Sequence, residues 1–421
     1  MANSPSFLQA NANKDSKPNY SKWVVYLMIL LMITTGSINT IANKLQNLST
    51  SLDRRYQHNW FITFCMFLGE CLCLIAYYIM LYVEKNKKTQ DEELLVNHKN
   101  IDKSARTENT DSDSQVNQTA LKEPSPFSLM LPALCDFFGS SIMTIGLGLI
   151  ASSVYQMLRG SLIIFTTIFS IIFLKSKFHR HNYLGITVVV SGLTLVGIAS
   201  LGGSSDDSNN AVVGFTLVIF AQLFTATQFI IEENFMKKYT CHPLKAVGWE
   251  GIWGTCFYLV FLVVAQNIKC PVGDSPNDFF KLICFQSKDN GVYLLEDTLF
   301  ALRQLGNNSS LLFYCILYIF SIGLFNFVGI SISKILSSPA RAVIDTIRTI
   351  VVWGFFLLPI VEEEDREHFK WLQFIGFILL ILGTVIYNEI LVIPIFGFDK
   401  YIKDSNGKYR HEKKDVSSPE I

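Results

Sequence analysis

Seven charged side chains lie inside stretches of the chain that are otherwise apolar, and their chemistry is the first clue to what the chain can do. They are Glu70, Asp136, Arg159, Glu232, Glu250, Asp345 and Arg348. If these stretches cross a lipid bilayer, each charge costs roughly 2.5–3.5 kcal/mol unless a partner or water offsets it. A water-filled central cavity that collects these charges is the economical arrangement, and it would suit the passage of a polar solute.

Two positions carry arginines that could meet an anion. Arg341, Asp345 and Arg348 are spaced at i, i+4 and i+7, so they share one face of a helix. This face either holds an internal salt bridge that only neutralises Asp345, or it also presents one arginine to an anionic substrate. Arg159 lies well inside another apolar run, beside Gly160, and an unpaired arginine at that depth is a functional candidate by default.

The buried glutamates are candidates for proton coupling. Glu70 and Glu250 lie among apolar residues, and Glu232 lies near the end of its apolar run. A glutamate in a medium of low dielectric constant can exchange a proton near neutral pH. The alternative is a structural pair with an arginine of a neighbouring helix, and the sequence leaves both open.

The elements that must position these residues are membrane-spanning helices. Half of the 421 residues are hydrophobic and 17% are charged, against about 25% charged in soluble chains. Apolar runs of about 20 residues match one helical crossing, and they do not alternate as barrel strands would. We predict an all-α membrane protein with spans at Lys22–Lys44, Trp60–Val83, Phe127–Leu149, Ser152–Leu174, Asn182–Leu201, Ala211–Met236, Leu244–Gln266, Leu311–Ile332, Pro339–Pro359 and Phe369–Ile390.

Charge in the connecting loops predicts which side of the membrane each loop occupies. Lysine and arginine concentrate in alternate short loops and in the C-terminal tail, which places both termini in the cytosol; Arg54 and Arg55 are an exception. This orientation gives a disordered cytosolic tail (1–21), a disordered cytosolic loop (84–126), a luminal loop (267–310) and a cytosolic tail (391–421).

The luminal loop carries two features that fit an oxidising compartment. Cys270 and Cys284 could form a disulfide there. Asn307 and Asn308 each begin a glycosylation sequon in the same loop.

The chain also shows signs of an internal repeat. The stretch from Asp136 to Gly139 resembles the stretch from Asn326 to Gly329, about 190 residues further on. Gly185 and Gly192 match Gly376 and Gly383 at nearly the same separation. Two five-helix repeats, 22–202 and 211–390, would enter the membrane from opposite faces, which is a transporter architecture. The alternative is that small residues recur in membrane helices because they pack closely.

Other function classes find little support. The neutral net charge gives no reason to expect a nucleic-acid partner. The sequence has no metal-binding cysteine pattern, no H-E-x-x-H motif and no phosphate-binding loop, so we expect neither an enzyme nor a bound metal or cofactor. The remaining alternatives are a secondary transporter and a non-transporting scaffold or receptor with the same fold.

Seven short motifs together resemble the drug/metabolite transporter superfamily. The closest resemblance is to solute carrier family 35, subfamily F, in the branch of member six, with EamA-like and nucleotide-sugar-transporter-like proteins and, more distantly, chloroquine-resistance-transporter-like proteins as kin. The motifs are TGSINT from Thr35, FLGE from Phe67, ALCD from Ala133, YQMLRG from Tyr155, HPLKAVG from His242, FNFVGI from Phe325 and DTIRT from Asp345.

The resemblance implies ten helices in two inverted repeats, a central cavity and alternating access. It implies a lysosomal, vacuolar or Golgi membrane, with a mitochondrial membrane as the alternative, and a nucleotide-sugar or other small metabolite as substrate. A proton and a second copy of the chain are further candidate partners beside the lipid bilayer. The matched positions that it implies as cavity residues are Glu70, Asp136, Gln156, Arg159, Glu250, Asn326, Asp345 and Arg348.

Overall fold

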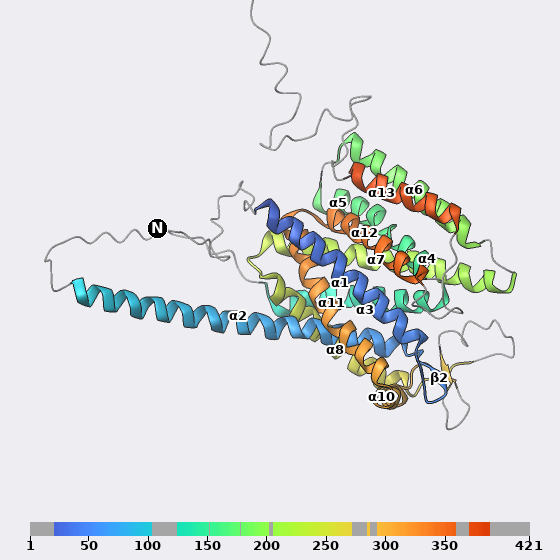
Figure 1. The fold of residues 1–421 in the computed structure, drawn as a ribbon, viewed down its shortest axis with the longest axis horizontal. Helices are drawn as coiled ribbons and strands as arrows, with labels where there is room; N and C mark the ends of the chain where they lie inside the picture. Colours follow the sequence, from blue (N-terminus) through green and yellow to red (C-terminus); the bar gives the residue numbers. More distant parts are fainter. Residues whose placement is uncertain are drawn as a thin grey trace, which may run out of the picture.

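The computed structural model describes residues 21–102, 124–150, 152–176, 178–201, 205–271, 284–286, 293–358 and 370–387. The predicted N-terminal and C-terminal tails and part of the predicted 84–126 loop lie outside these residues. Within them the chain is a bundle of long helices, with two small antiparallel sheets at one end (Figure 1). The expected all-α membrane fold is confirmed at this level.

In the described part of the chain, eight helical segments are long and apolar enough to cross a bilayer. They are formed by α1 (Lys22–Leu48), α2 (Asn59–Asp102), η1 with α3 (Pro126–Leu129 and Met130–Leu149), α4 with α5 (Ser152–Arg159 and Leu162–Leu174), α6 (Arg180–Leu201), α7 (Ser205–Lys238), α8 (Pro243–Ala265) and α11 (Ser309–Ile335).

Two further helices occupy the last two predicted spans. α12 (Ser338–Leu357) has 20 residues, but Arg341, Asp345 and Arg348 interrupt its apolar character. α13 (Trp371–Tyr387) is strongly apolar but has only 17 described residues. The ends predicted for these spans, near residues 359, 369 and 390, lie outside the described residues.

The second helix differs from its predicted extent. α2 has 44 residues, which corresponds to about 66 Å at 1.5 Å per residue. It therefore continues well past the predicted span end at Val83, into a segment for which the sequence predicts disorder, and Figure 1 shows this end projecting far from the bundle. Glu84, Lys85, Lys87 and Lys88 are good helix formers, so a helix that starts in the membrane can propagate through them.

The fourth span is interrupted at its centre. α4 ends at Arg159 and α5 begins at Leu162. Between them the Gly160 amide donates to the Met157 carbonyl at 3.0 Å and the Ser161 amide donates to the Leu158 carbonyl at 3.0 Å. These i to i−3 bonds are a short 3₁₀ link, the geometry that often marks a functional hinge in a helix.

Glycines decide which helices approach most closely. α6 lies along α13, and a Cβ at Gly192 would lie 2.6 Å from the Gly376 carbonyl oxygen, while one at Gly185 would lie 2.8 Å from that of Gly383. Only a residue without a side chain fits such a contact. The four glycines of the repeat therefore lie in one helix contact, but crosswise: Gly185 meets Gly383 and Gly192 meets Gly376, whereas the sequence matches Gly185 with Gly376 and Gly192 with Gly383.

The remaining helices pack in further long contacts. α1 lies on α11, α3 on α7, and α2 on both α8 and α11. The largest apolar cluster, which includes Phe67, Tyr258 and Phe325, joins α1, α2, α8 and α11. Large apolar side chains such as Ile75, Phe173 and Val260 are exposed on the outer surface, as expected for a surface that contacts lipid.

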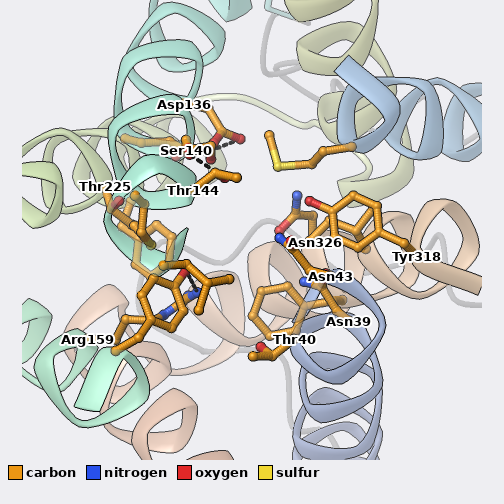
Figure 2. A pocket seen from close by; sticks show the side chains of 18 of the residues that line it. Asn39, Thr40, Asn43, Asp136, Ser140, Thr144, Arg159, Thr225, Tyr318 and Asn326 are labelled. Carbon is orange, nitrogen blue, oxygen red and sulfur yellow. Dashed lines mark hydrogen bonds between the residues drawn. The ribbon is translucent and has the colours of Figure 1, made fainter. Parts of the chain in front are cut away.

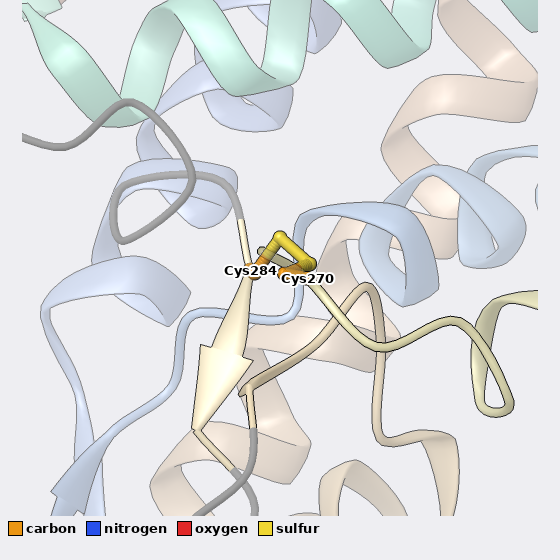
Figure 3. Close-up of a disulfide and its surroundings, with 2 residues drawn as sticks. All are labelled: Cys270 and Cys284. Carbon is orange, nitrogen blue, oxygen red and sulfur yellow. A yellow bond between two sulfur atoms is a disulfide. The ribbon is translucent and has the colours of Figure 1, made fainter. Parts of the chain in front are cut away.

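One end of the bundle carries the small sheets, and we call it the disulfide face. It contains residues 48–59 with the hairpin β1 (Thr50–Ser51) and β2 (Arg54–Arg55), and residues 266–271, 284–286 and 293–308 with β3 (Phe285–Gln286), β4 (Tyr293–Leu294) and α10 (Thr298–Asn307). Cys270 and Cys284 form a disulfide there (Figure 3). The end of the bundle at which α1 begins is called the opposite face.

Candidate functional site

A polar cavity lies between the helices. The space between its walls is about 690 Å³ when the part open to the outside is included. Side chains from α1, α2, α3, α4, α7, α11 and α12 line it. The polar lining residues are Asn39, Thr40, Asn43, Asp136, Ser140, Thr144, Tyr155, Arg159, Thr225, Gln228, Tyr318, Asn326 and Arg341.

The polar groups face one another across the cavity. Figure 2 shows Asp136, Ser140, Thr144, Thr225 and Arg159 on one side, from α3, α4 and α7. Asn39, Thr40, Asn43, Tyr318 and Asn326 lie on the other side, from α1 and α11. Helices that are far apart in the sequence therefore supply opposite walls.

The cavity occupies the part of the bundle nearer the disulfide face. Asn43 lies in the last turns of α1, and Tyr318 lies in the first half of α11, both toward that face. Arg341, in the first turn of α12, lies at the other end of the lining. The lining therefore extends from the first turn of α12 to the last turns of α1.

Arg159 is the cation that the cavity wall presents. Its Nη2 donates to Asp345 Oδ2 at 3.2 Å, and its Nη1 donates to the Tyr155 hydroxyl at 3.3 Å. Its Nε has no hydrogen-bond partner among the described residues. The side chain is 16% exposed. The guanidinium is thus held in place by two groups, and its Nε is buried.

Behind Arg159, one carboxylate serves two arginines. Arg348 Nε lies 3.1 Å from Asp345 Oδ1, and Arg348 Nη1 donates to the Gly36 carbonyl at 3.4 Å. A Cβ at Gly36 would lie 2.7 Å from Arg348 Nη1, so glycine makes room for this side chain. Arg159, Asp345 and Arg348 together carry one net positive charge. Arg348 is not among the lining residues.

The third arginine of this region is neutralised on its own. Arg341 Nη1 donates to Glu232 Oε2 at 2.6 Å, and its guanidinium lies 3.7 Å from the centre of the Phe229 ring. A Cβ at Gly329 would lie 2.6 Å from Arg341 Nε. Of the two arginines predicted on one face of α12, Arg348 therefore shares Asp345, and Arg341 pairs with α7.

The anionic side of the wall is centred on Asp136. Its Oδ1 accepts a hydrogen bond from Ser140, and its Oδ2 accepts one from Gln228 Nε2 at 3.2 Å. Asn326 lines the opposite wall and donates to Glu70 Oε1, which lies behind it. A solute in the cavity would therefore meet a fixed carboxylate and a fixed guanidinium, both hydrogen-bonded in place.

Of the eight predicted substrate-contacting residues, three line the cavity and five do not. Asp136, Arg159 and Asn326 line the cavity. Glu70, Asp345 and Gln156 hold a lining residue from behind, Gln156 through a 2.8 Å hydrogen bond to Thr40 Oγ1. Arg348 lies behind Asp345. Glu250 is buried on α8, outside the lining, and its Oε1 has no hydrogen-bond partner among the described residues.

The sequence reasoning missed most of the uncharged lining residues, and it left open which arginine of the Arg341–Arg348 face would reach the cavity; the structure places Arg341 there. A signal was present, because Asp136, Ser140 and Thr144 follow one another at i+4 spacing on α3, as do Asn39 and Asn43 on α1. Polar groups repeated on one helical face indicate a wet surface. A single polar residue such as Gln228 carries no such signal, since interhelical bonding explains it equally well.

The described helices form a multi-pass membrane bundle with a polar cavity between them. A family model described as CRT-like, chloroquine-resistance transporter-like, matches residues 113–387. The chain belongs to this family.

Relatives extend the same conclusion over most of the chain. Solute carrier family 35 member F6 of Mus musculus is 34% identical over 390 residues, which is 89% of this chain and 92% of that one. An uncharacterised protein of Schizosaccharomyces pombe is 32% identical over 270 residues, 63% of this chain and 75% of its own. A UDP-xylose and UDP-N-acetylglucosamine transporter of Danio rerio is 29% identical over 131 residues, 28% of this chain and 38% of its own.

These findings confirm the predicted relationship to solute carrier family 35 and the drug/metabolite transporters. They also confirm that the chain is not an enzyme, because the named solute carriers are transporters. The protein therefore works in a lipid bilayer on a small-molecule substrate.

Proposed function

We propose that this protein is a secondary transporter that moves a small organic solute by alternating access through the polar cavity. The observation that carries the proposal is the pair of Arg159 and Asp136 on the cavity wall at membrane depth. Charged groups are retained there only when they pair, meet water or bind a solute. Arg159 suits an anionic group such as that of a nucleotide sugar, the substrate class named for the Danio rerio relative, and Asp136 suits a cationic or hydroxyl group.

The proposal includes ten helices in two inverted five-helix repeats, α1 to α6 and α7 to α13. Packing supports it. If each helix is replaced by its counterpart in the other half, the α1–α11 contact becomes the α7–α3 contact. The α2–α8 and α6–α13 contacts stay unchanged, because each of them joins two counterpart helices. The Gly185–Gly383 and Gly192–Gly376 approaches fit the same exchange. Such symmetry lets one fold adopt two conformations of opposite access.

Contacts at the opposite face support the alternating-access part of the proposal. Besides the Arg341–Glu232 pair, Glu233 Oε2 accepts from the Ser338 amide at 2.6 Å, and Ser338 Oγ donates to the Phe229 carbonyl at 2.7 Å. These bonds join α7 to the first turn of α12. Access from the opposite face would require them to break.

We extend the proposal to proton coupling through Glu70, Glu232 and Glu250. Glu70 Oε2, Glu232 Oε1 and Glu250 Oε1 have no hydrogen-bond partner among the described residues. A carboxylate oxygen without a partner is costly in surroundings of low dielectric constant, so a bound proton lowers the cost of burial. Glu232 is the exception among the three, because its other oxygen, Oε2, is already paired with Arg341. Glu70 is the member connected to the cavity, through Asn326.

For the location we propose an endomembrane, of the lysosome, vacuole or Golgi, with both termini cytosolic. The Cys270–Cys284 disulfide supports a disulfide face in an oxidising lumen. A mitochondrial membrane remains the alternative, and a homodimer remains a prediction from the sequence.

The two overlapping sequons test this orientation. Asn308 Nδ2 donates to the Thr50 carbonyl at 3.0 Å, and its Oδ1 caps α11 by accepting from the Ser310 and Leu311 amides. Asn307 is exposed. We expect that Asn307→Gln removes an endoglycosidase-sensitive band shift and that Asn308→Gln leaves it. The reverse result would contradict the geometry, and a wild-type protein without a glycan would contradict a luminal disulfide face.

Transport itself is tested with purified protein in liposomes. A panel of nucleotide sugars, organic acids, amino acids and organic amines is offered with and without a pH gradient. We expect saturable uptake of one class, accelerated by the gradient if protons are coupled. Solute binding without uptake would favour the scaffold or receptor alternative, and a covalently changed solute would revive an enzyme.

A further inference from the structure

A buried histidine on the disulfide face lies outside the cavity. His58 immediately precedes α2, and it is fully buried, with an exposed fraction of 0%. Its ring packs against Phe285 of β3, with ring centres 4.4 Å apart, and against Tyr56 at 5.1 Å. Both ring nitrogens face side chains from the segment around α10, Glu296 and Gln304.

The atom that faces His58 Nε2 can only accept a hydrogen bond. Gln304 Nε2 donates to the Ser51 carbonyl at 2.8 Å and to the Arg54 carbonyl at 3.3 Å. The amide orientation is therefore set, because only the nitrogen can face two carbonyl oxygens. Gln304 Oε1 then faces His58 Nε2 at 3.0 Å, so Nε2 carries a hydrogen and donates it.

The partner of Nδ1 is also an acceptor elsewhere in the network. Glu296 Oε1 accepts from the Asp297 amide at 2.9 Å, and Glu296 Oε2 accepts from the Phe61 amide at 3.3 Å. With Nε2 already protonated, the contact between His58 Nδ1 and Glu296 Oε1 needs one further proton. Without that proton, the ring lone pair would face a carboxylate oxygen at hydrogen-bond distance, which is repulsive.

Other titratable groups near the cluster do not supply this proton. Burial raises the pKa of Tyr56 well above its usual value, so its hydroxyl stays neutral. Asp297 uses its carboxylate to cap α10 by accepting from the Phe300 amide at 3.0 Å. Arg54 meets the cluster through its carbonyl oxygen.

The cluster connects separate parts of the disulfide face. Ser51 and Arg54 belong to the hairpin between α1 and α2, Gln304 belongs to α10, and Phe285 directly follows the disulfide at Cys284. Ser51 Oγ also donates to the Gln304 carbonyl at 3.0 Å. The helices that leave this junction, α1, α2 and α11, all contribute to the cavity wall.

We propose that His58, Glu296 and Gln304 form a proton-dependent latch, which fastens the α1–α2 hairpin to α10 when the disulfide face is acidic and loosens when it becomes alkaline. The direction follows from the hydrogen bonds: with the extra proton both ring nitrogens of His58 donate to oxygens, and without it a ring lone pair faces the Glu296 carboxylate, so the contacts hold at low pH and weaken as pH rises. The latch affects the stability of the disulfide face, and it can be tested without a transported solute.

The test compares the full-length protein in detergent or nanodiscs from about pH 6 to about pH 9. We expect the thermal unfolding midpoint of the wild type to fall by about 3 °C or more over this range. Amide hydrogen exchange in 49–62 and 293–308, corrected for the chemical exchange rate, should accelerate over the same range.

Glu296→Gln provides the sharp comparison. The neutral amide removes the carboxylate charge that the extra proton offsets, so the network should gain less from holding that proton. The pH dependence should therefore weaken. Asp297→Asn is the matched control, because asparagine also caps a helix, and it should keep the wild-type dependence.

Two results would overturn the latch. One is that amide hydrogen exchange in 49–62 and 293–308 of the wild type does not change with pH. This measurement does not depend on the folding of any variant. The other is a Glu296→Gln protein that keeps the wild-type pH dependence.

Discussion

Replacing Arg159 with glutamine is expected to reduce the initial rate of solute uptake by roughly tenfold to 150-fold, with folded protein retained. Hydrogen bonds to charged groups contribute about 1.5–3 kcal/mol, which corresponds to this range if the solute loses such a bond. Folding should survive because Asp345 still faces Arg348, 3.1 Å away, and the remaining pair is neutral. The measurement is uptake into proteoliposomes, with the thermal unfolding midpoint as the folding control.

Arg159→Lys separates charge from geometry at the same site. Lysine keeps the charge but cannot reproduce the bond to Asp345 and the bond to Tyr155 with one planar group. We expect an intermediate uptake rate, with the apparent affinity changed more than the maximal rate. Wild-type uptake by both variants would show that the solute does not contact this guanidinium, and the site assignment would be wrong.

Asp345→Asn is expected to have the largest effect on stability, a loss of about 3–5 kcal/mol. The carboxylate of Asp345 is the anion that Arg159 and Arg348 share, and it is 5% exposed. Its removal would leave two guanidinium groups close together in the membrane interior. The measurement is the thermal or denaturant unfolding midpoint of the purified protein.

A second substitution gives the control for this prediction. Arg348→Met in the Asp345→Asn background restores the single net positive charge of the wild-type cluster, so it should recover part of the lost stability. Additive losses in the double variant would contradict the shared-carboxylate account. Arg348→Met alone should be milder than Asp345→Asn, because it leaves Arg159 with its partner.

The sequence was sufficient for the membrane class and the positions of most spans, and it indicated seven buried charges, of which Asp136 and Arg159 line the cavity. These are local properties, since about 20 apolar residues span the hydrocarbon whatever their neighbours, and a charge such as Asp136 among them is costly in any fold. The glycine matches could also be recognised in the sequence, because only glycine permits the close helix approach at Gly192 and Gly376.

The roles of individual charges were decided by the tertiary structure. Arg341 and Arg348 lie on one face of one helix, and nothing in that helix tells which of them meets Asp345. Glu232 from α7 binds the guanidinium of Arg341, and the carbonyl of Gly36 from α1 accepts a hydrogen bond from Arg348. Likewise, no residue near His58 in the sequence indicates that Glu296, 238 positions away, contacts its ring. The length of an apolar segment depends only on consecutive residues, so the sequence shows it directly. The partner of a buried charge depends on which side chains the packed helices bring within a few ångströms, so only the tertiary structure shows it.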